Sequence, residues 1–211
     1  MSQLHTKRSD SIGRDSPNQF QVVAIGASAG GIQSLDQVLS VLGSDFPCGV
    51  LVVLHLHPQH KTLIDRLLAN VTDLRVKMAM QGEPIHEGVV YLAPPDRHLL
   101  VREGCVELTD TKVVEWVRPS VDVLFESVAR WFGSGSIGVV LSGSLRDGAT
   151  GIRRIKEAGG VTMAEDPAHA RFAGMPSAAV STGCVDFVLP LPQLGPMLLQ
   201  LTRNQQTISN G

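Results

Sequence analysis

Three long apolar runs, each leading directly into a turn, constrain the fold of this chain more than any other feature. They are QVVAIG at residues 21–26, CGVLVVLHL at 48–56 and SIGVVLSG at 136–143. A continuous apolar run of this length is typical of a strand that is buried on both faces of a parallel sheet. Segments with helical periodicity separate the runs. We therefore predict an α/β fold, with an open, doubly wound, mostly parallel sheet in a single domain.

Shorter patterns complete this alternation of strands and helices. HLLVREG at 98–104 and CVELTD at 105–110 predict a small β-hairpin insertion. SVDVLFESVARWF at 120–132 predicts a helix with Ser120 as its N-cap. KTLIDRLLANV at 61–71 predicts another helix. The inward-facing residues of that helix would be Leu63, Ile64, Leu67 and Leu68.

Composition bounds the class of protein. The chain has 211 residues, of which 43% are hydrophobic, and a formal net charge of -2, which disfavours nucleic acid and membrane surfaces as partners. Its three cysteines lack metal-site spacing and are typical of a reduced, cytoplasmic protein. Neither a signal peptide nor a membrane-spanning run is present. We expect a disordered segment or linker at 1–18, a globular domain at 19–203 and a flexible tail at 204–211.

The turn after the first strand carries the sequence GASAG at 26–30, which has the pattern G-x-S-x-G. Such a turn can present Ser28 as a nucleophile above the N-terminus of a helix. A dinucleotide-binding fingerprint would need a second glycine where Ser28 stands, because the pyrophosphate must approach the backbone closely there. The remaining alternative is that Ser28 only caps the following helix.

Two further polar residues come at the ends of the other apolar runs. His55 follows the second run, and Asp147 lies shortly after the third. Because the carboxyl ends of parallel strands meet at one edge of a sheet, Ser28, His55 and Asp147 are expected to converge there as nucleophile, general base and orienting carboxylate. Taken singly, His55 could be a packed core imidazole, and Asp147 could be the N-cap of the helix ATGIRRIKEAG at 149–159.

The segment HLHPQH offers a metal site as another alternative. His55, His57 and His60 have the spacing H-x-H-x-x-H, and residues two apart on a strand point the same way. Gln59 is a poor ligand for a hard cation, and Pro58 interrupts the strand. The sequence therefore favours a protein without a metal site, although metal-dependent hydrolysis through His55 and His57 remains a distinct hypothesis.

Beyond these local patterns, residues 20–201 resemble the catalytic domain of the chemotaxis protein-glutamate methylesterases of the CheB type. The motifs that carry the resemblance occur in colinear order over nearly the whole globular part. They are IGASAGG, VVLHLHPQHKTLIDRLL, VYLAPPDRHLLV, RPSVDVLFESVA, VVLSGSLRDGATGI, IKEAGG and EDPAHARFAGMPSAAVSTGCVDFVLP.

The resemblance implies hydrolysis of glutamate methyl esters on chemoreceptor helices, and in many members deamidation of receptor glutamines. It places the catalytic triad on Ser28, His55 and Asp147, in agreement with the strand-end argument. No metal or organic cofactor is implied. The expected partners are methylated chemoreceptors, with a methyltransferase or a separate regulator as further candidates, and the expected location is the cytoplasm.

Other site residues follow from the resemblance alone. The backbone N–H groups of Ala29 and Ser144 would form the oxyanion hole, and Met175 and Pro176 of the GMP pattern would lie at the substrate rim. Leu145 stands where the family usually has glycine. If that glycine had a positive φ, Leu145 would strain or reshape the loop that carries Ser144.

This departure leaves a second class of function open, a binding module of the same fold with weakened catalysis. The typical chemotaxis enzyme also carries an N-terminal receiver domain, and some twenty polar residues stand in its place here. The chain is therefore either an isolated domain of a larger protein or a standalone member without phosphorylation control.

Overall fold

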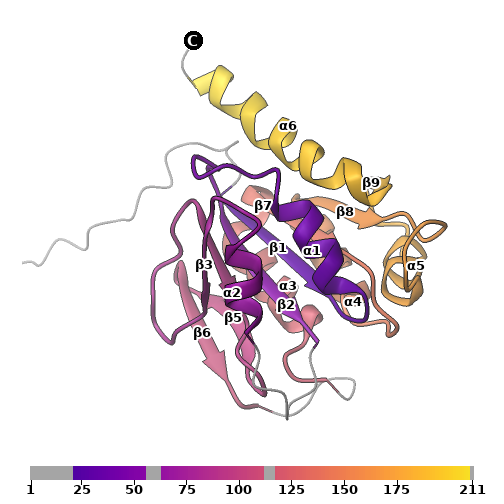
Figure 1. The fold of residues 1–211 in the computed structure, drawn as a ribbon, viewed down its shortest axis with the longest axis horizontal. Helices are drawn as coiled ribbons and strands as arrows, with labels where there is room; N and C mark the ends of the chain where they lie inside the picture. Colours follow the sequence, from indigo (N-terminus) through magenta and orange to yellow (C-terminus); the bar gives the residue numbers. More distant parts are fainter. Residues whose placement is uncertain (1–20, 56–62, 112–116, 210–211) are drawn as a thin grey trace, which may run out of the picture.

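The structure, a computed structural model, describes residues 21–55, 63–111 and 117–209. Within these ranges seven strands form one sheet in the order β3-β4-β2-β1-β7-β8-β9, and every neighbouring pair is parallel (Figure 1). The strands are β1 Val22–Ala27, β2 Gly49–Leu54, β3 Arg75–Met78, β4 Val89–Leu92, β7 Ser136–Val140, β8 Val161–Glu165 and β9 Phe187–Leu189. The prediction of a doubly wound parallel sheet is confirmed.

Helices cover both faces of this sheet. They are α1 Gly31–Leu39, α2 Ile64–Ala69, α3 Val121–Phe132, α4 Ala149–Glu157, α5 Gly174–Val180 and α6 Leu191–Ser209. Side chains of α1, α2 and α6 pack in one hydrophobic cluster, and those of α3, α4 and α5 pack in the other. The α6 helix continues past residue 203, where the sequence suggested a tail. None of the helices in the described ranges is both long and apolar enough to cross a bilayer.

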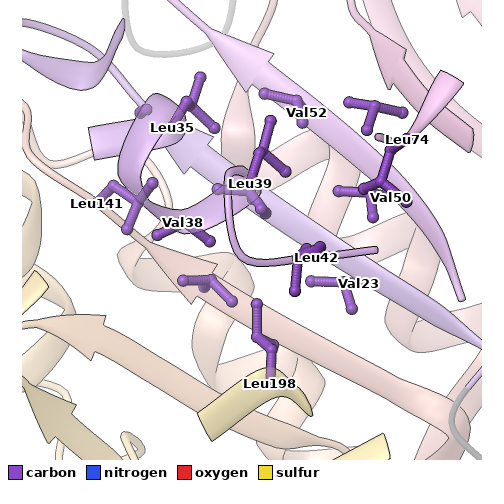
Figure 2. Packing of buried hydrophobic residues seen from close by; sticks show 14 of the residues in the cluster. Val23, Leu35, Val38, Leu39, Leu42, Val50, Val52, Leu74, Leu141 and Leu198 are labelled. Carbon is purple, nitrogen blue, oxygen red and sulfur yellow. The ribbon is translucent and has the colours of Figure 1, made fainter. Parts of the chain in front are cut away.

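The alternating faces of the central strands explain the two clusters. All six residues of β1 and of β2 are buried, as expected for strands covered on both sides. Figure 2 shows part of the cluster beneath α1, to which Leu35 and Leu39 of the helix and Val50 and Val52 of β2 belong. The apolar runs of the sequence are therefore the two-sided core of the fold.

A small antiparallel hairpin packs against α3 on the other face. It consists of β5 (His98–Arg102) and β6 (Cys105–Thr109), as the sequence predicted. Leu99, Val106 and Leu108 of the hairpin belong to the same cluster as Val128 of α3. The hairpin therefore covers an apolar side of α3 that would otherwise face solvent.

The prediction for the second helix was wrong in part. Ile64 and Leu68 of α2 are buried, but Leu63 and Leu67 are 59% and 56% exposed. The helix has only six residues. So short a helix rests on the sheet along one i, i+4 row, and the adjacent row, turned by about 100°, points away.

Strand order determines where a site can form. The chain enters at the centre with β1, builds β2, β3 and β4 on one side, and returns to β7 on the other side of β1. The direction in which the chain adds strands to the sheet therefore reverses at β1, with β2 on one side of it and β7 on the other. In open α/β sheets, the crevice outside the carboxyl ends of the strands at such a point is the usual binding site.

Candidate active site

Ser28 lies in a tight turn between β1 and α1. The amide of Gly31 donates to the carbonyl of Ser28 over 2.8 Å, and Gly30 has a φ of 75°. Glycine adopts this left-handed conformation without steric cost. The amide of Ser28 donates to the carbonyl of Ser142, in the loop after β7, over 3.0 Å. The turn therefore holds Ser28 at the carboxyl edge of the sheet and ties it to a second strand.

His55 comes immediately after β2, next to Ser28. Ala27 and Leu54 are paired in the register of β1 and β2, and the amide of His55 donates to the carbonyl of Ala27 over 3.0 Å. Ser28 and His55 thus occupy the next position on two neighbouring parallel strands, which lie about 4.8 Å apart. Both residues line one open pocket.

The imidazole of His55 is paired with Asp147. Nε2 of His55 lies 2.9 Å from Oδ2 of Asp147, and the two side chains are 10% and 1% exposed. An ionised carboxylate only accepts hydrogen bonds, so Nε2 must carry the shared proton. Nδ1 of His55 is then the acceptor, and it is buried without a hydrogen-bond partner among the described residues. The basic nitrogen of the imidazole, Nδ1, is therefore available to accept a proton. We call this nitrogen the open Nδ1.

Asp147 is fixed by the N-terminus of α3 as well as by His55. Its carboxylate accepts hydrogen bonds from the amides of Val121 (2.6 Å) and Asp122 (3.0 Å) and from Oγ of Ser120 (2.9 Å). Burial raises the pKa of Asp147, but the hydrogen bonds from His55 and from these two amides outweigh it and hold the pKa below its ordinary value. Asp147 is therefore ionised and rigid.

The alternative role of Asp147 as the N-cap of α4 is not what the structure shows. The N-cap residue of α4 is Gly148, which has no side chain to accept a hydrogen bond from the first turn of the helix. Instead, Oδ1 of Asp122 accepts the amides of Gly148 (2.9 Å) and Gly151 (2.6 Å). Asp147, at the start of α4, caps α3, and Asp122, at the start of α3, caps α4. Ser120 is the N-cap of α3, as predicted.

A buried carboxylate that the sequence analysis did not single out supports the turn. Oε2 of Glu165, at the end of β8, accepts the amide of Ser142 (2.8 Å) and Oγ of Ser34 (3.2 Å). Oγ of Ser142 in turn donates to the carbonyl of Ala29 over 3.0 Å. Burial raises the pKa of Glu165, and its hydrogen bonds oppose this only in part. Glu165 therefore links β8 to both sides of the Ser28 turn.

The two predicted oxyanion donors differ in position. Ala29 lines the pocket beside Ser28, and its amide makes no hydrogen bond to another described residue. Ser144 is exposed on the loop after β7, outside the pocket lining. Among the described non-glycine residues only Asp96 and Glu103 have a positive φ. Leu145 therefore occupies ordinary backbone, and the strain considered for it does not arise.

Met175 and Pro176 do not form an exposed rim. Met175 is 0% exposed, and Pro176 is also buried. A Cβ at Gly143 would lie 2.1 Å from Sδ of Met175 and 2.9 Å from Cβ of Ser28. Met175 thus packs beneath the loop, because Gly143 leaves room for it. The exposed side chains at the pocket mouth are instead Arg171 and Phe172.

The metal alternative depends on residues that the structure does not describe. His57 and His60 lie outside the described ranges. Within those ranges no group of three or more His, Cys, Asp or Glu side chains is arranged to hold a metal ion. His55, the one member of the motif that is described, is engaged with Asp147.

A scan of family models matches residues 23–198 to the CheB methylesterase domain. The chain belongs to the CheB methylesterase family. The crystal structure of the Thermotoga maritima CheB methylesterase catalytic domain matches with a TM-score of 0.82 and 34% sequence identity, over 87% of this chain and 99% of that one. The fold and the family suggested by the sequence motifs are therefore confirmed.

Curated relatives in the CheB family carry names that describe an activity. A protein-glutamate methylesterase/protein-glutamine glutaminase 2 from Anaeromyxobacter dehalogenans is 44% identical over 88% of this chain and 54% of its own length. A Leptospira interrogans protein named "Putative protein-glutamate methylesterase/protein-glutamine glutaminase" is 34% identical over 88% of this chain and 96% of its own length. The chain thus spans about half of the first relative and nearly all of the second.

Two supports of this CheB-family site were missed in the sequence. Asp122 lies within the first turn of a predicted helix, where an acidic residue is common and carries no signal of its own. Glu165 ends an apolar strand pattern, VTMAE, at the same sheet edge as the other polar residues. The strand-end rule that selected Ser28, His55 and Asp147 would have selected Glu165 too, had it been applied to β8.

Proposed function

We propose that this chain is a serine hydrolase that removes methyl esters from glutamate side chains of chemoreceptor helices and deamidates receptor glutamines by the same route. The names of its relatives support this activity. The single structural observation that supports it best is the open Nδ1 of His55, paired through Nε2 with Asp147 and adjacent in register to Ser28.

In the proposed first step, Oγ of Ser28 attacks the ester carbonyl carbon while Nδ1 of His55 takes the hydroxyl proton. The imidazolium that forms is stabilised by the ionised carboxylate of Asp147. The developing oxyanion is held by backbone amides, of which that of Ala29 is best placed. The C–O bond to the methoxy group then breaks, and Nδ1–H protonates the leaving group to give methanol.

The second half of the cycle uses the same residues. Water attacks the acyl-Ser28 ester and gives one proton to Nδ1 of His55, which passes it to Oγ of Ser28 as the C–O bond to Ser28 breaks. The product leaves as the glutamate side chain, whose carboxylic acid gives its remaining proton to solvent. With a glutamine side chain the leaving group is ammonia instead of methanol, and the rest of the sequence is unchanged. No disulfide links the cysteines of the described ranges, which suits the cytoplasmic location proposed for the protein.

Methanol release from a methylated chemoreceptor fragment tests this proposal. Wild-type protein is expected to release methanol, and Ser28→Ala is expected to lower the rate by at least about 10³-fold while leaving the circular dichroism spectrum and the unfolding midpoint unchanged. Ser181→Ala is a matched control, since Ser181 ends α5 away from the pocket lining. Retained activity in Ser28→Ala would exclude Ser28 as the nucleophile.

A further inference from the structure

Among the described residues that line the pocket above Ser28, Arg171 is the one cationic side chain. Apart from Ser28, Ala29, Gly30 and His55, the described lining of this roughly 600 Å³ pocket consists of Ile32, Gln33, Arg171 and Phe172. Ile32 and Phe172 are each 40% exposed. A substrate that enters therefore meets two apolar side chains, one amide and one guanidinium group before it reaches the nucleophile.

The guanidinium group is held in place from two sides. Nη1 of Arg171 donates to Oε1 of Gln33 over 2.6 Å, and Cζ of Arg171 lies 5.9 Å from the centre of the Phe172 ring. The backbone of Phe172 is anchored as well, because its amide donates to Oγ of Ser142 (3.0 Å) and its carbonyl accepts the amide of Gly143 (2.9 Å). Arg171 is therefore positioned relative to the same loop that holds Ser28.

The absence of a side chain at Gly30 allows Arg171 and Phe172 to lie close to the Ser28 turn. A Cβ at Gly30 would lie 3.1 Å from Cδ2 of Phe172 and 3.3 Å from Cδ of Arg171. Any side chain at position 30 would push both away from the turn. The close approach of Arg171 to the nucleophile is thus built into the sequence of the turn.

The charge of Arg171 is not neutralised by the described part of the chain. No carboxylate there forms an ion pair with it, and its hydrogen bond is to an uncharged amide. The carboxylates of Asp147 and Glu165, which support the site, are buried and bonded to other groups. A guanidinium group has five N–H donors, so most of them remain for a ligand.

We propose that Arg171 selects methyl esters that have a carboxylate close by on the same substrate surface. The inference rests on the proposed esterase activity and specifies its substrate class as an acidic polypeptide segment. On a helix, the matching carboxylate would come three or four residues from the esterified glutamate, because those positions share a face. Hydrolysis of one ester would then improve a neighbouring ester as a substrate, since it creates the carboxylate that Arg171 binds.

Two helical peptides of equal length test the proposal. Each carries one glutamate methyl ester, and the residues three and four positions away are glutamate in one peptide and glutamine in the other. Wild-type protein is expected to show a kcat/KM for methanol release about fivefold higher for the acidic peptide at low salt, falling towards equality near 1 M salt. The ratio of the two values is unaffected by the fraction of active enzyme in a preparation.

Charge substitutions then assign the preference to one residue. Arg171→Gln is expected to bring the ratio to about one, and Arg171→Glu to bring it below one. Arg130→Gln is the matched control, because Arg130 is exposed in the last turn of α3, whose first turn binds Asp147. It is expected to keep the wild-type ratio. A fivefold preference that survives in Arg171→Gln, or one that is lost equally in Arg130→Gln, would overturn the proposal.

Failure of the esterase activity itself would be recognised separately. If neither peptide yields methanol, fluorescence anisotropy measures the binding of ester-free versions of both peptides to the Ser28→Ala protein. Tighter binding of the acidic peptide, abolished by an added Arg171→Gln substitution, would support the recognition of carboxylates by Arg171 without the activity. Equal binding of the two peptides would overturn it.

Discussion

Oδ2 of Asp147 accepts two hydrogen bonds at once, from Nε2 of His55 at 2.9 Å and from the amide of Val121 at 2.6 Å. One oxygen atom therefore serves both the imidazole and the N-terminus of α3. A helix N-terminus stabilises a negative charge, so α3 favours the ionised carboxylate that His55 needs. The stability of this helix and the orientation of the base are coupled through a single side chain.

Asp147→Asn should damage both functions. An asparagine places its NH2 group either at the Oδ2 position, against both Nε2–H of His55 and the amide of Val121, or at the Oδ1 position, against the amide of Asp122. We therefore expect kcat to fall by about three orders of magnitude and the unfolding free energy by about 1–3 kcal/mol. Asp122→Asn is the matched control, because the carboxylate of Asp122 accepts the two amides that cap α4. It should cost similar stability but less than about tenfold in kcat. Urea unfolding and methanol release measure the two effects, and equal kcat losses would contradict the assignment.

The pH dependence of stability should show the charge of Asp147. Its pKa is lowered in the folded state, so its contribution to stability is complete above its unfolded pKa of about 3.8 and is lost as the pH falls through the folded value. The difference in unfolding free energy between wild type and Asp147→Asn should therefore be constant near neutral pH and shrink below about pH 4. Urea titrations across this range test the sign. A difference that does not change with pH would show that the carboxylate charge is not stabilised.

Glu165 should show the opposite slope. Burial raises its folded pKa above the ordinary 4.5, so ionisation costs stability as the pH rises from about 4.5 through the folded value. Glu165→Gln keeps an acceptor for the amide of Ser142 and for Ser34 without that cost. The variant should thus become more stable relative to wild type as the pH rises.

Glu165→Ala, by contrast, leaves the two donors buried and unpaired and should cost about 2–4 kcal/mol together with most of the activity. Glu126→Ala is the control, since Glu126 is half exposed on α3 and should change stability by less than about 0.5 kcal/mol. A Glu165→Gln variant that loses stability with rising pH would refute the account of this carboxylate.

Gly30 and Gly82 form a matched pair for the turn. Their φ angles are 75° and 76°, but a Cβ at Gly30 would meet Oγ of Ser142 at 2.9 Å, whereas nothing lies within 4 Å at Gly82. Alanine at either position should cost about 1 kcal/mol of backbone strain. Only Gly30→Ala should also displace the Ser142 contact and lower kcat/KM by more than about tenfold. Equal activity of the two variants would show that the pocket does not need the close approach.

Leu145 should tolerate glycine without any improvement in activity. Because Leu145 has no positive φ, Leu145→Gly relieves no strain and only adds backbone freedom to the loop. Its kcat/KM for methanol release should equal the wild-type value or fall by up to about fivefold. A large increase would mean that leucine distorts the oxyanion loop during the reaction, in favour of a catalytically weakened module.

Sequence patterns were sufficient to predict the parallel sheet and the polar residues at its edge. Strands buried on both faces have long apolar runs, and the carboxyl ends of parallel strands meet at one edge of the sheet. Contacts between elements far apart in the sequence were not accessible in this way. The exchange of caps between Asp122 and Asp147 depends on two helix N-termini lying side by side. The burial of Met175 depends on the missing side chain of Gly143, and the exposure of Leu67 on the shortness of α2.

The activation of Ser28 by the open Nδ1 of His55 is tested most directly with a fluorophosphonate probe, which reacts only with an activated hydroxyl. Peptide mapping by mass spectrometry should find one modified serine, Ser28, in the native protein. Labelling should be lost in His55→Ala, in Asp147→Asn and after denaturation. Absence of labelling at Ser28 in folded wild-type protein, or labelling that persists without His55, would contradict the proposed triad.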